Sequence, residues 1–300
     1  MNTLMTTEKI RAARLSIVSN TSLVLVKLII GILMGSVAVL SEAIHSGLDL
    51  LASIVAYYAV GKAGKPADDR HPYGHGKWEN VSGVVEALLI LAAALYIMYE
   101  AVMRFTNGSQ VEHLGLGTAV MAVSAIVNWF MSGYLFRVAK STQSIALEAD
   151  AWHLRADVYT SVGVLAGLAL IAITNITWLD SVAAIAVALL IIRSAFDLTR
   201  DSMGDLFDKR LPVEDEAKIK EIFSRYQGGC IRFHRLRSRK SGSMRFIDLH
   251  LVVPRKWSIE EAHNLGDTIE KDILEALPNT QVIIHIDPCN KSLEPCSCGS

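Results

Sequence analysis

The chain has 300 residues, of which 51% are hydrophobic and 20% are charged, and its mean hydropathy is +0.34. A soluble globular protein needs less apolar sequence than this, and a chain lying wholly in a membrane carries less charge, so we expect a membrane part and a soluble part. The formal net charge of -1 gives no indication of a nucleic-acid partner.

Six apolar segments are each long enough to cross a bilayer, for which a helix needs about 20 residues. They lie near residues 13-34, 37-60, 80-103, 115-137, 147-173 and 178-199, within a predicted membrane domain of residues 1-207. Isolated polar residues inside them, such as Lys27, Glu86 and Asn128, are interpreted as packing or snorkelling side chains, because none has a partner at ligand spacing.

Lysine and arginine residues are concentrated in alternate loops. They precede the first segment and lie in the loops at residues 61-78 and 137-140, whereas the loops on the other side carry Arg104 and little else. The positive-inside rule therefore predicts that both termini face the cytoplasm. We expect the chain to lie in the cell (inner) membrane.

A polar pattern occurs twice, once in the second apolar segment and once in the fifth. Residues 42-53 read Glu-Ala-Ile-His-Ser-Gly-Leu-Asp-Leu-Leu-Ala-Ser, and residues 150-161 read Asp-Ala-Trp-His-Leu-Arg-Ala-Asp-Val-Tyr-Thr-Ser. Each copy places a His and an Asp four residues apart, and so on one face of a helix. With three segments in each half, the copies run in opposite directions, as in the inverted repeats of many transporters. A tetrahedral ligand set for a zinc-like ion results from His45, Asp49, His153 and Asp157.

The loop between the second and third segments is rich in Gly, Pro and charge, and we expect it to have no regular structure. It contains Asp68, His71 and His75, which offer an oxygen and two imidazoles for a second, solvent-accessible metal. The run His-Pro-Tyr-Gly-His lacks the Glu of the zinc-protease motif, and no nucleophile with its base or phosphate loop is found. We therefore do not expect an enzyme.

Beyond Arg200 the periodicity changes. A helical pattern at 213-226 is followed by strand-like alternation at 231-238 and 245-253, a helical pattern at 258-277 that opens with a capping box, and a strand at 281-287. This αββαβ order predicts a small cytoplasmic α+β domain over residues 208-288.

Metal-ligating residue types gather in this domain. His285 and Asp287 lie two residues apart on one predicted strand and so share a face, and His250 lies on a strand that could pair nearby. We interpret the group as a surface metal cluster, which consists of His234, His250, His263, His285 and Asp287.

All four cysteines, Cys230, Cys289, Cys296 and Cys298, lie in the last third of the chain. They are too few and too clustered for a secreted disulfide framework and suit a reducing compartment. The Cys-x-Cys in the tail of residues 289-300 fits either a soft-metal site or a tail with spare thiols.

These motifs carry a resemblance to a known family. From about Lys9 to Asp287 the chain resembles the cation diffusion facilitators, in particular the bacterial dimeric zinc and iron efflux transporters. The most specific parts are the two intramembrane motifs, the His250 and His285-x-Asp287 pattern, and the loop Asp68-Asp69-Arg70-His71-Pro72-Tyr73-Gly74-His75-Gly76-Lys77.

The resemblance implies a homodimer of six-helix subunits with metallochaperone-like cytoplasmic domains. It assigns the transport site, the loop site and the cytoplasmic cluster to the three residue groups given above. It also implies that Lys77 and Asp208 form an interlocking charge pair at the dimer interface. His45 stands where some bacterial members have Asp, and in this family a His there resembles the zinc and cadmium pattern.

We therefore expect a proton-coupled antiporter in the lipid bilayer that exports a divalent transition metal from the cytoplasm, most readily zinc and also cadmium. Zinc or a similar ion is expected both as substrate and as a bound regulatory ion, with protons as counter-ion. The alternative is a membrane metal sensor or structural zinc protein that does not transport.

Overall fold

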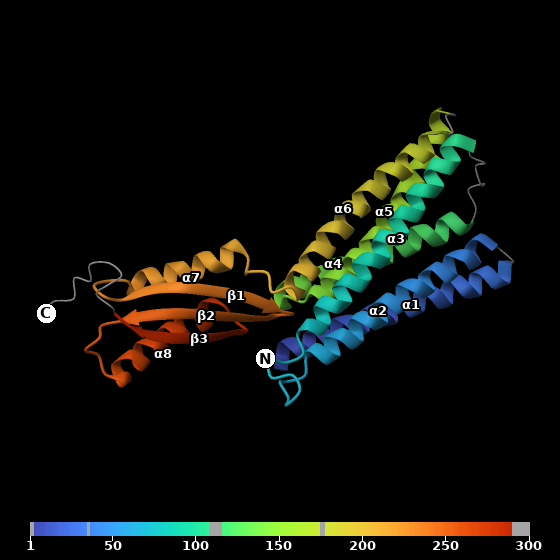
Figure 1. The fold of residues 1–300 in the computed structure, drawn as a ribbon. Coiled ribbons are helices and arrows are strands. Elements are labelled where there is room, and N and C mark those ends of the chain that lie inside the picture. Colours follow the sequence, from blue (N-terminus) through green and yellow to red (C-terminus); the bar gives the residue numbers. More distant parts are fainter. Residues whose placement is uncertain (1–2, 35–36, 108–115, 175–177, 290–300) are drawn as a thin grey trace. The chain divides into compact units, whose positions relative to one another are not determined.

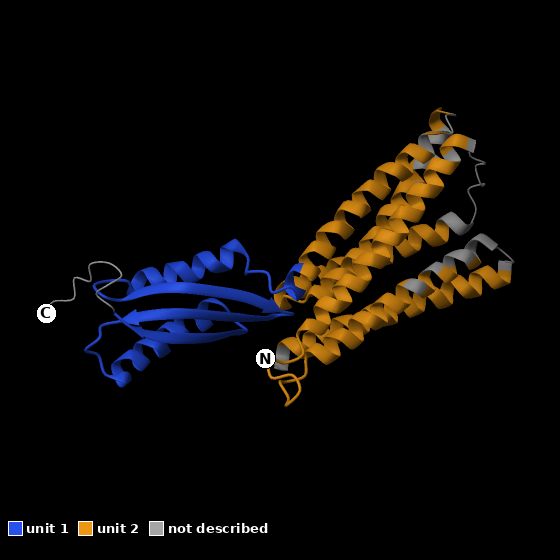
Figure 2. Cartoon of the chain, viewed as in Figure 1, with its two compact units in different colours: residues 1, 204–300 blue, residues 2–203 orange. Residues whose placement is uncertain are grey.

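The computed structural model describes residues 3–34, 37–107, 116–174 and 178–289. By their internal contacts the residues form two compact units, one of residues 2–203 and the other of residues 204–300 (Figure 2). Each unit is described by itself below.

The first unit consists of long helices, and all six predicted apolar segments are helical (Figure 1). Several helices extend past the predicted segments, and the first begins ten residues before residue 13, so the helices continue beyond their apolar parts. Their bounds are α1 Thr3–Met34, α2 Val37–Ala63, α3 Lys77–Asn107, α4 Leu116–Thr142, α5 Ile145–Thr174 and α6 Trp178–Leu206.

Four helices within the described residues are long and apolar enough to cross a membrane, namely α1, α3, α4 and α6. The other two, α2 and α5, contain the repeated polar motif, and each includes residues whose side chains lie outside the described part of the chain. Many large apolar side chains of the unit are exposed, among them Ile32, Leu33 and Phe130. Such a surface suits contact with lipid, and the chain is a multi-pass membrane protein.

The helices pack through small side chains. Ala12, Ala87, Ala149 and Ala151 are each 0% exposed and lie in the two hydrophobic clusters of this unit. A Cβ atom added at Gly83 would lie 2.6 Å from the hydroxyl of Ser202, which shows how closely α3 approaches α6. Small residues permit this approach, because helix association in a membrane depends on close packing.

The second unit has the αββαβ order expected from the sequence. The elements are α7 Val213–Tyr226, β1 Arg232–Ser241, β2 Met244–Val253, α8 Ile259–Ala276 and β3 Thr280–Pro288. In the sheet, β2 is central, antiparallel to β1 and parallel to β3. The apolar core joins one face of β2, through Ile247, Leu249 and Leu251, to both helices. The two helices therefore cover one face of the sheet. The residues of β2 that alternate with the core residues, such as His250, belong to the other face.

Two local irregularities determine the register of β1. A two-residue turn joins it to β2, and Gly242 has a positive φ of 58°, which glycine adopts without steric cost. A β-bulge lies between His234 and Arg237, where Arg235 has a φ of 51°. Two residues of β1 there face one residue of β2, and this places His234 directly opposite His250.

Candidate metal centres

The repeated motif brings side chains of α2 and α5 together. Nε2 of His153 lies 3.1 Å from Oδ1 of Asp49, and Ser53, one turn further along α2, donates to Asp150, which lies just under a turn earlier in α5. Contacts that advance along α2 while they go back along α5 show that the two helices run antiparallel. This is the geometry expected of an inverted repeat.

Three of the four predicted ligands form one cluster. Asp49, His153 and Asp157 each offer a ligand atom, and these atoms lie within 4.8 Å of one another. Asp49 and His153 are buried, and Asp157 is half-buried. Ligand atoms of a tetrahedral zinc site lie roughly 3.4 Å apart, so small side-chain rotations would close the group around an ion. His45 lies in α2 four residues before Asp49, but its side chain is outside the described residues.

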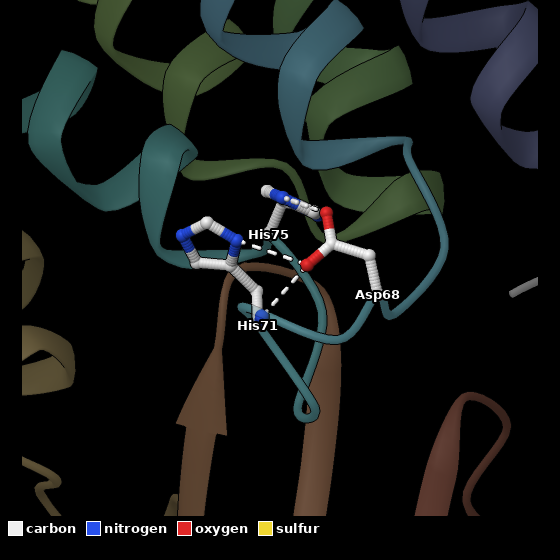
Figure 3. Close-up of side chains that lie close together, drawn as sticks. All are labelled: Asp68, His71 and His75. Atoms are coloured by element: carbon white, nitrogen blue, oxygen red, sulfur yellow. Dashed lines mark hydrogen bonds and ion pairs between the residues drawn. The ribbon is translucent and has the colours of Figure 1, made fainter.

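The predicted loop site also comes together (Figure 3). Oδ1 of Asp68 accepts hydrogen bonds from the backbone N–H groups of Arg70 at 3.0 Å and His71 at 2.7 Å, which folds the loop around the carboxylate. Nδ1 of His71 lies 3.2 Å from Oδ1 of Asp68, and Nε2 of His75 lies 3.3 Å from Oδ2. The loop has no regular structure, as expected, yet its three ligands point toward one another.

The charge of Asp68 is stabilised by the loop itself. The backbone hydrogen bond from His71 is the main cause that lowers the pKa of this carboxyl, with further contributions from the side chain of His71 and the backbone of Arg70. Asp68 therefore remains an ionised oxygen ligand at any physiological pH. His75 is mostly buried, while Asp68 and His71 are exposed, so an ion could reach this site from solvent.

The cytoplasmic cluster lies on the sheet face that α7 and α8 leave uncovered. His234, His250 and His285 are direct partners across β1, β2 and β3, and adjacent rings lie 5.0 Å and 4.7 Å apart. Asp287 lies at the centre of the group, because its carboxylate is 3.1 Å from Nε2 of His234, 2.8 Å from Nδ1 of His250 and 3.2 Å from Nε2 of His285.

His263 is placed apart from these four. It lies on α8, where its Nε2 is 3.4 Å from Oδ2 of Asp267, one turn further along the same exposed helix face. The structure therefore brings four of the five predicted residues together within one chain. A ligand role for His263 stays a prediction.

Replacing Asp287 by Asn is expected to weaken zinc binding by the cytoplasmic cluster at least about tenfold, since even changes outside the ligand shell commonly cost 10–100-fold. The pKa of Asp287 is lowered, chiefly by its hydrogen bond with His250, so the wild-type carboxylate is charged throughout the physiological range. The stability it contributes is present above the unfolded pKa and is lost only as the pH falls through the lowered folded value. Calorimetric zinc titration checks the affinity, with Asp267→Asn as the matched control, for which an unchanged affinity is expected.

The predicted charge interlock involves both units. Lys77 begins α3, and Asp208 lies beyond α6, where its Oδ1 is 3.4 Å from Nη1 of Arg239. A pairing of Lys77 with Asp208 between protomers stays a prediction.

Two cysteines differ from the pattern of a reducing compartment, where disulfides are rare. Cys230 and Cys289 are buried and disulfide-bonded, while Cys296 and Cys298 lie outside the described residues. Cys230 precedes β1 and Cys289 follows β3, and the strand directions bring these two termini to the same end of the sheet.

Two buried polar groups were not singled out by sequence reasoning. One joins Ser53 to Asp150, and both belong to the repeated motif, so the repeat itself was a usable signal. The other is the ion pair of Lys9 and Glu79, with Nζ and Oε1 2.7 Å apart. Residues 70 positions apart give no local pattern that would have indicated this pair.

Comparisons with known proteins agree with this arrangement. Residues 13–207 match the family model described as the cation efflux transmembrane domain, and residues 211–289 match that of the cation efflux protein, cytoplasmic domain. An uncharacterized transporter of Synechocystis sp. is 37% identical over 254 residues, covering 85% of this chain and 82% of its own length. The cation-efflux pump FieF of Shewanella oneidensis is 31% identical over 277 residues, covering 92% of this chain and 93% of its own.

Among solved structures, the metal-bound C-terminal domain of the CzcD transporter from Thermotoga maritima is 27% identical, covers 27% of this chain and 94% of its own length, and has a TM-score of 0.25. The two family models together cover nearly all of the chain, in the order membrane domain and then cytoplasmic domain. The chain therefore belongs to the cation efflux family, the cation diffusion facilitators, whose members are transporters of divalent metals.

Proposed function

We propose that this chain is a proton-coupled antiporter that exports zinc, and also cadmium, from the cytoplasm. The observation that supports it most is the buried group of Asp49, His153 and Asp157 on the antiparallel helices α2 and α5. Ionisable groups at membrane depth are costly, and they usually mark a substrate or ion path. A sensor or structural zinc protein has no need of such a group.

Charge balance supports a divalent ion as the substrate. Two carboxylates neutralise an ion of charge +2, and imidazole from His153 and His45 would complete four ligands without adding charge. The loaded site is then neutral, and a neutral site can change its access across a low-dielectric region at little cost. Nitrogen and oxygen ligands in this number favour zinc over magnesium or calcium, which prefer more oxygen ligands.

The same ligands couple metal binding to protons. Imidazole and carboxylate must be deprotonated to bind a metal, so binding releases protons and acid favours metal release. A near-neutral cytoplasm would load the site, and a more acidic exterior would empty it. This orientation rests on the distribution of Lys and Arg, which favours cytoplasmic termini. We propose the inner membrane as the location of the chain.

We further propose that the chain acts as a homodimer and that metal at the cytoplasmic cluster regulates it. The match of residues 211–289 to the cytoplasmic domain of cation efflux proteins supports the dimer. Asp287 with its three histidines lies on an uncovered sheet face, where an ion could also contact a second chain. Metal that binds one conformation more tightly would shift the population toward it.

The deciding experiment is metal flux into proteoliposomes containing the full chain, with and without a pH gradient, for a panel of divalent ions. Zinc uptake accelerated by a gradient that is acidic on the acceptor side supports antiport. A zinc flux that does not depend on the pH gradient rules out proton coupling. The absence of flux for every ion would favour the alternative of a sensor.

His45→Asp is expected to broaden transport toward iron(II) or manganese, because it replaces a nitrogen ligand with a harder oxygen ligand. The measurement is the relative transport rate across the same panel of ions. As a control, Ile44→Val alters the exposed neighbouring residue of α2 without altering the ligand set. Unchanged relative rates in His45→Asp would contradict a role for this residue in selectivity.

A further inference from the structure

Two buried carboxylates lie outside the proposed metal ligands. Asp150 is on α5, three residues before His153, and Glu86 is on α3. Both are 0% exposed. Burying a carboxylate is costly unless it is paired or protonated, so each needs a physical explanation.

Hydroxyl and amide groups surround these carboxylates only in part. The Ser53 hydroxyl donates to Oδ1 of Asp150 at 2.8 Å and itself accepts from the Asn20 amide at 2.7 Å. The Ser82 hydroxyl donates to Oε1 of Glu86 at 3.1 Å. The second oxygens, Oδ2 of Asp150 and Oε2 of Glu86, are buried and have no hydrogen-bond partner among the described residues.

Nearby charges make full ionisation of both groups unfavourable. Glu86 and Asp150 repel each other, and Asp150 is also repelled by Asp49 and attracted by His153. In the part of the chain that the structure describes, no lysine or arginine forms an ion pair with either carboxylate. Two buried carboxylates that no described lysine or arginine pairs with are costly to ionise together, so the unpartnered oxygens of Glu86 and Asp150 are suited to hold a proton.

We propose that Glu86 and Asp150 form a proton-binding pair that supplies part of the counter-ion for metal transport, a role that rests on the antiport proposed above. A divalent ion held by Asp49, His153 and Asp157 brings positive charge within one helical turn of Asp150. This charge favours loss of the carboxyl proton: the O–H bond breaks, its electron pair stays on the oxygen, and the proton leaves to cytoplasmic water. When the metal departs to the exterior, a proton from that side takes its place.

The hydrogen bonds of Ser53 explain how the Glu86–Asp150 pair responds to changes at the metal site. Its single hydroxyl proton is donated to Asp150, while its oxygen accepts from Asn20 and lies 3.1 Å from the Ser16 hydroxyl. Ser53 thus connects α1, α2 and α5 at a point one turn from Asp49. A movement of α2 with α5 changes the surroundings of the metal ligands and of Asp150 together.

The test compares proton release per chain when the purified full chain is saturated with zinc in weak buffer containing a pH indicator. Asp150→Asn and Glu86→Gln imitate the protonated carboxyl in shape and are expected to release about one proton fewer per chain at zinc saturation than the wild type. The matched control is Glu148→Gln, an exposed carboxylate two residues before Asp150 on the same helix, which is expected to release the wild-type number.

Two results would overturn the inference. One is wild-type proton release from both variants while they still bind zinc. The other, measured on the wild type so that a misfolded variant does not matter, is an infrared difference spectrum in which zinc binding removes no signal of protonated carboxyl. Wild-type flux driven by a pH gradient distinguishes the two proposals, because antiport stands if that flux is present while the variants release the full number of protons.

Discussion

Asp157→Ala is expected to abolish metal-for-proton exchange, reducing zinc flux in proteoliposomes by at least about 100-fold. The variant lacks one of the two carboxylates that neutralise the ion, so a loaded site would carry an uncompensated positive charge in a buried setting. Breaking a buried charge pair typically costs about 3–5 kcal/mol, and each 1.4 kcal/mol is a factor of about ten.

The control for this experiment is Glu148→Ala, which deletes an exposed carboxylate nine residues before Asp157 in α5. It should transport at the wild-type rate, and zinc binding to the loop and cytoplasmic sites should persist in both variants. Undiminished flux in Asp157→Ala would refute the assignment of the transport site. Equal loss of flux in both variants would point to damage of α5 and not to a lost ligand.

Local periodicity explains what could be predicted from the sequence. The spacing of four residues in His153 and Asp157 defines a helix face without any knowledge of neighbours, and the spacing of two in His285 and Asp287 defines a strand face. Three membrane segments in each half predict that α2 and α5 run antiparallel. The contacts of Asp49 and Ser53 with α5 confirm this direction. Patterns of this kind depend only on chain position.

Tertiary geometry accounts for what could not be predicted. The bulge at Arg235 shifts β1 so that His234 meets His250, and no propensity of the neighbouring residues indicates a positive φ at an arginine. His263 has the same residue type as the cluster histidines, yet α8 directs it toward Asp267. Composition alone therefore grouped residues that the fold separates.

Isolated polar residues in apolar helices show a further limit. Glu86 was interpreted as a packing residue because no partner stood at ligand spacing in the sequence. The carboxylate that interacts with it by repulsion, Asp150, lies on another helix in the other half of the repeat. Pairings between distant segments arise only when the helices pack. The repeat contains Ser53 and Asp150, but their contact with each other and with Asn20 was visible only in the structure.

Glu79→Ala is expected to destabilise the membrane unit by about 3–5 kcal/mol, the usual cost of breaking a buried ion pair by removing one partner. Lys9 and Glu79 are 4% and 2% exposed, and their Nζ and Oε1 atoms lie 2.7 Å apart. Ser144, in the turn between α4 and α5, donates to the other oxygen of Glu79 at 2.5 Å, so one carboxylate connects α1, α3 and that turn.

The measurement is thermal unfolding of the purified full chain in detergent. Unfolding is monitored by the loss of the monodisperse peak in size-exclusion chromatography. A double variant, Lys9→Met with Glu79→Met, separates charge from packing, because a buried ion pair replaced by apolar residues of similar size is often neutral or stabilising. We expect the double variant to melt above Glu79→Ala and close to the wild type. If Glu79→Ala alone melts like the wild type, the pair does not hold these three elements together. If the double variant is as unstable as the single one, the shape of the Glu79 side chain, and not its charge, joins α1 to α3.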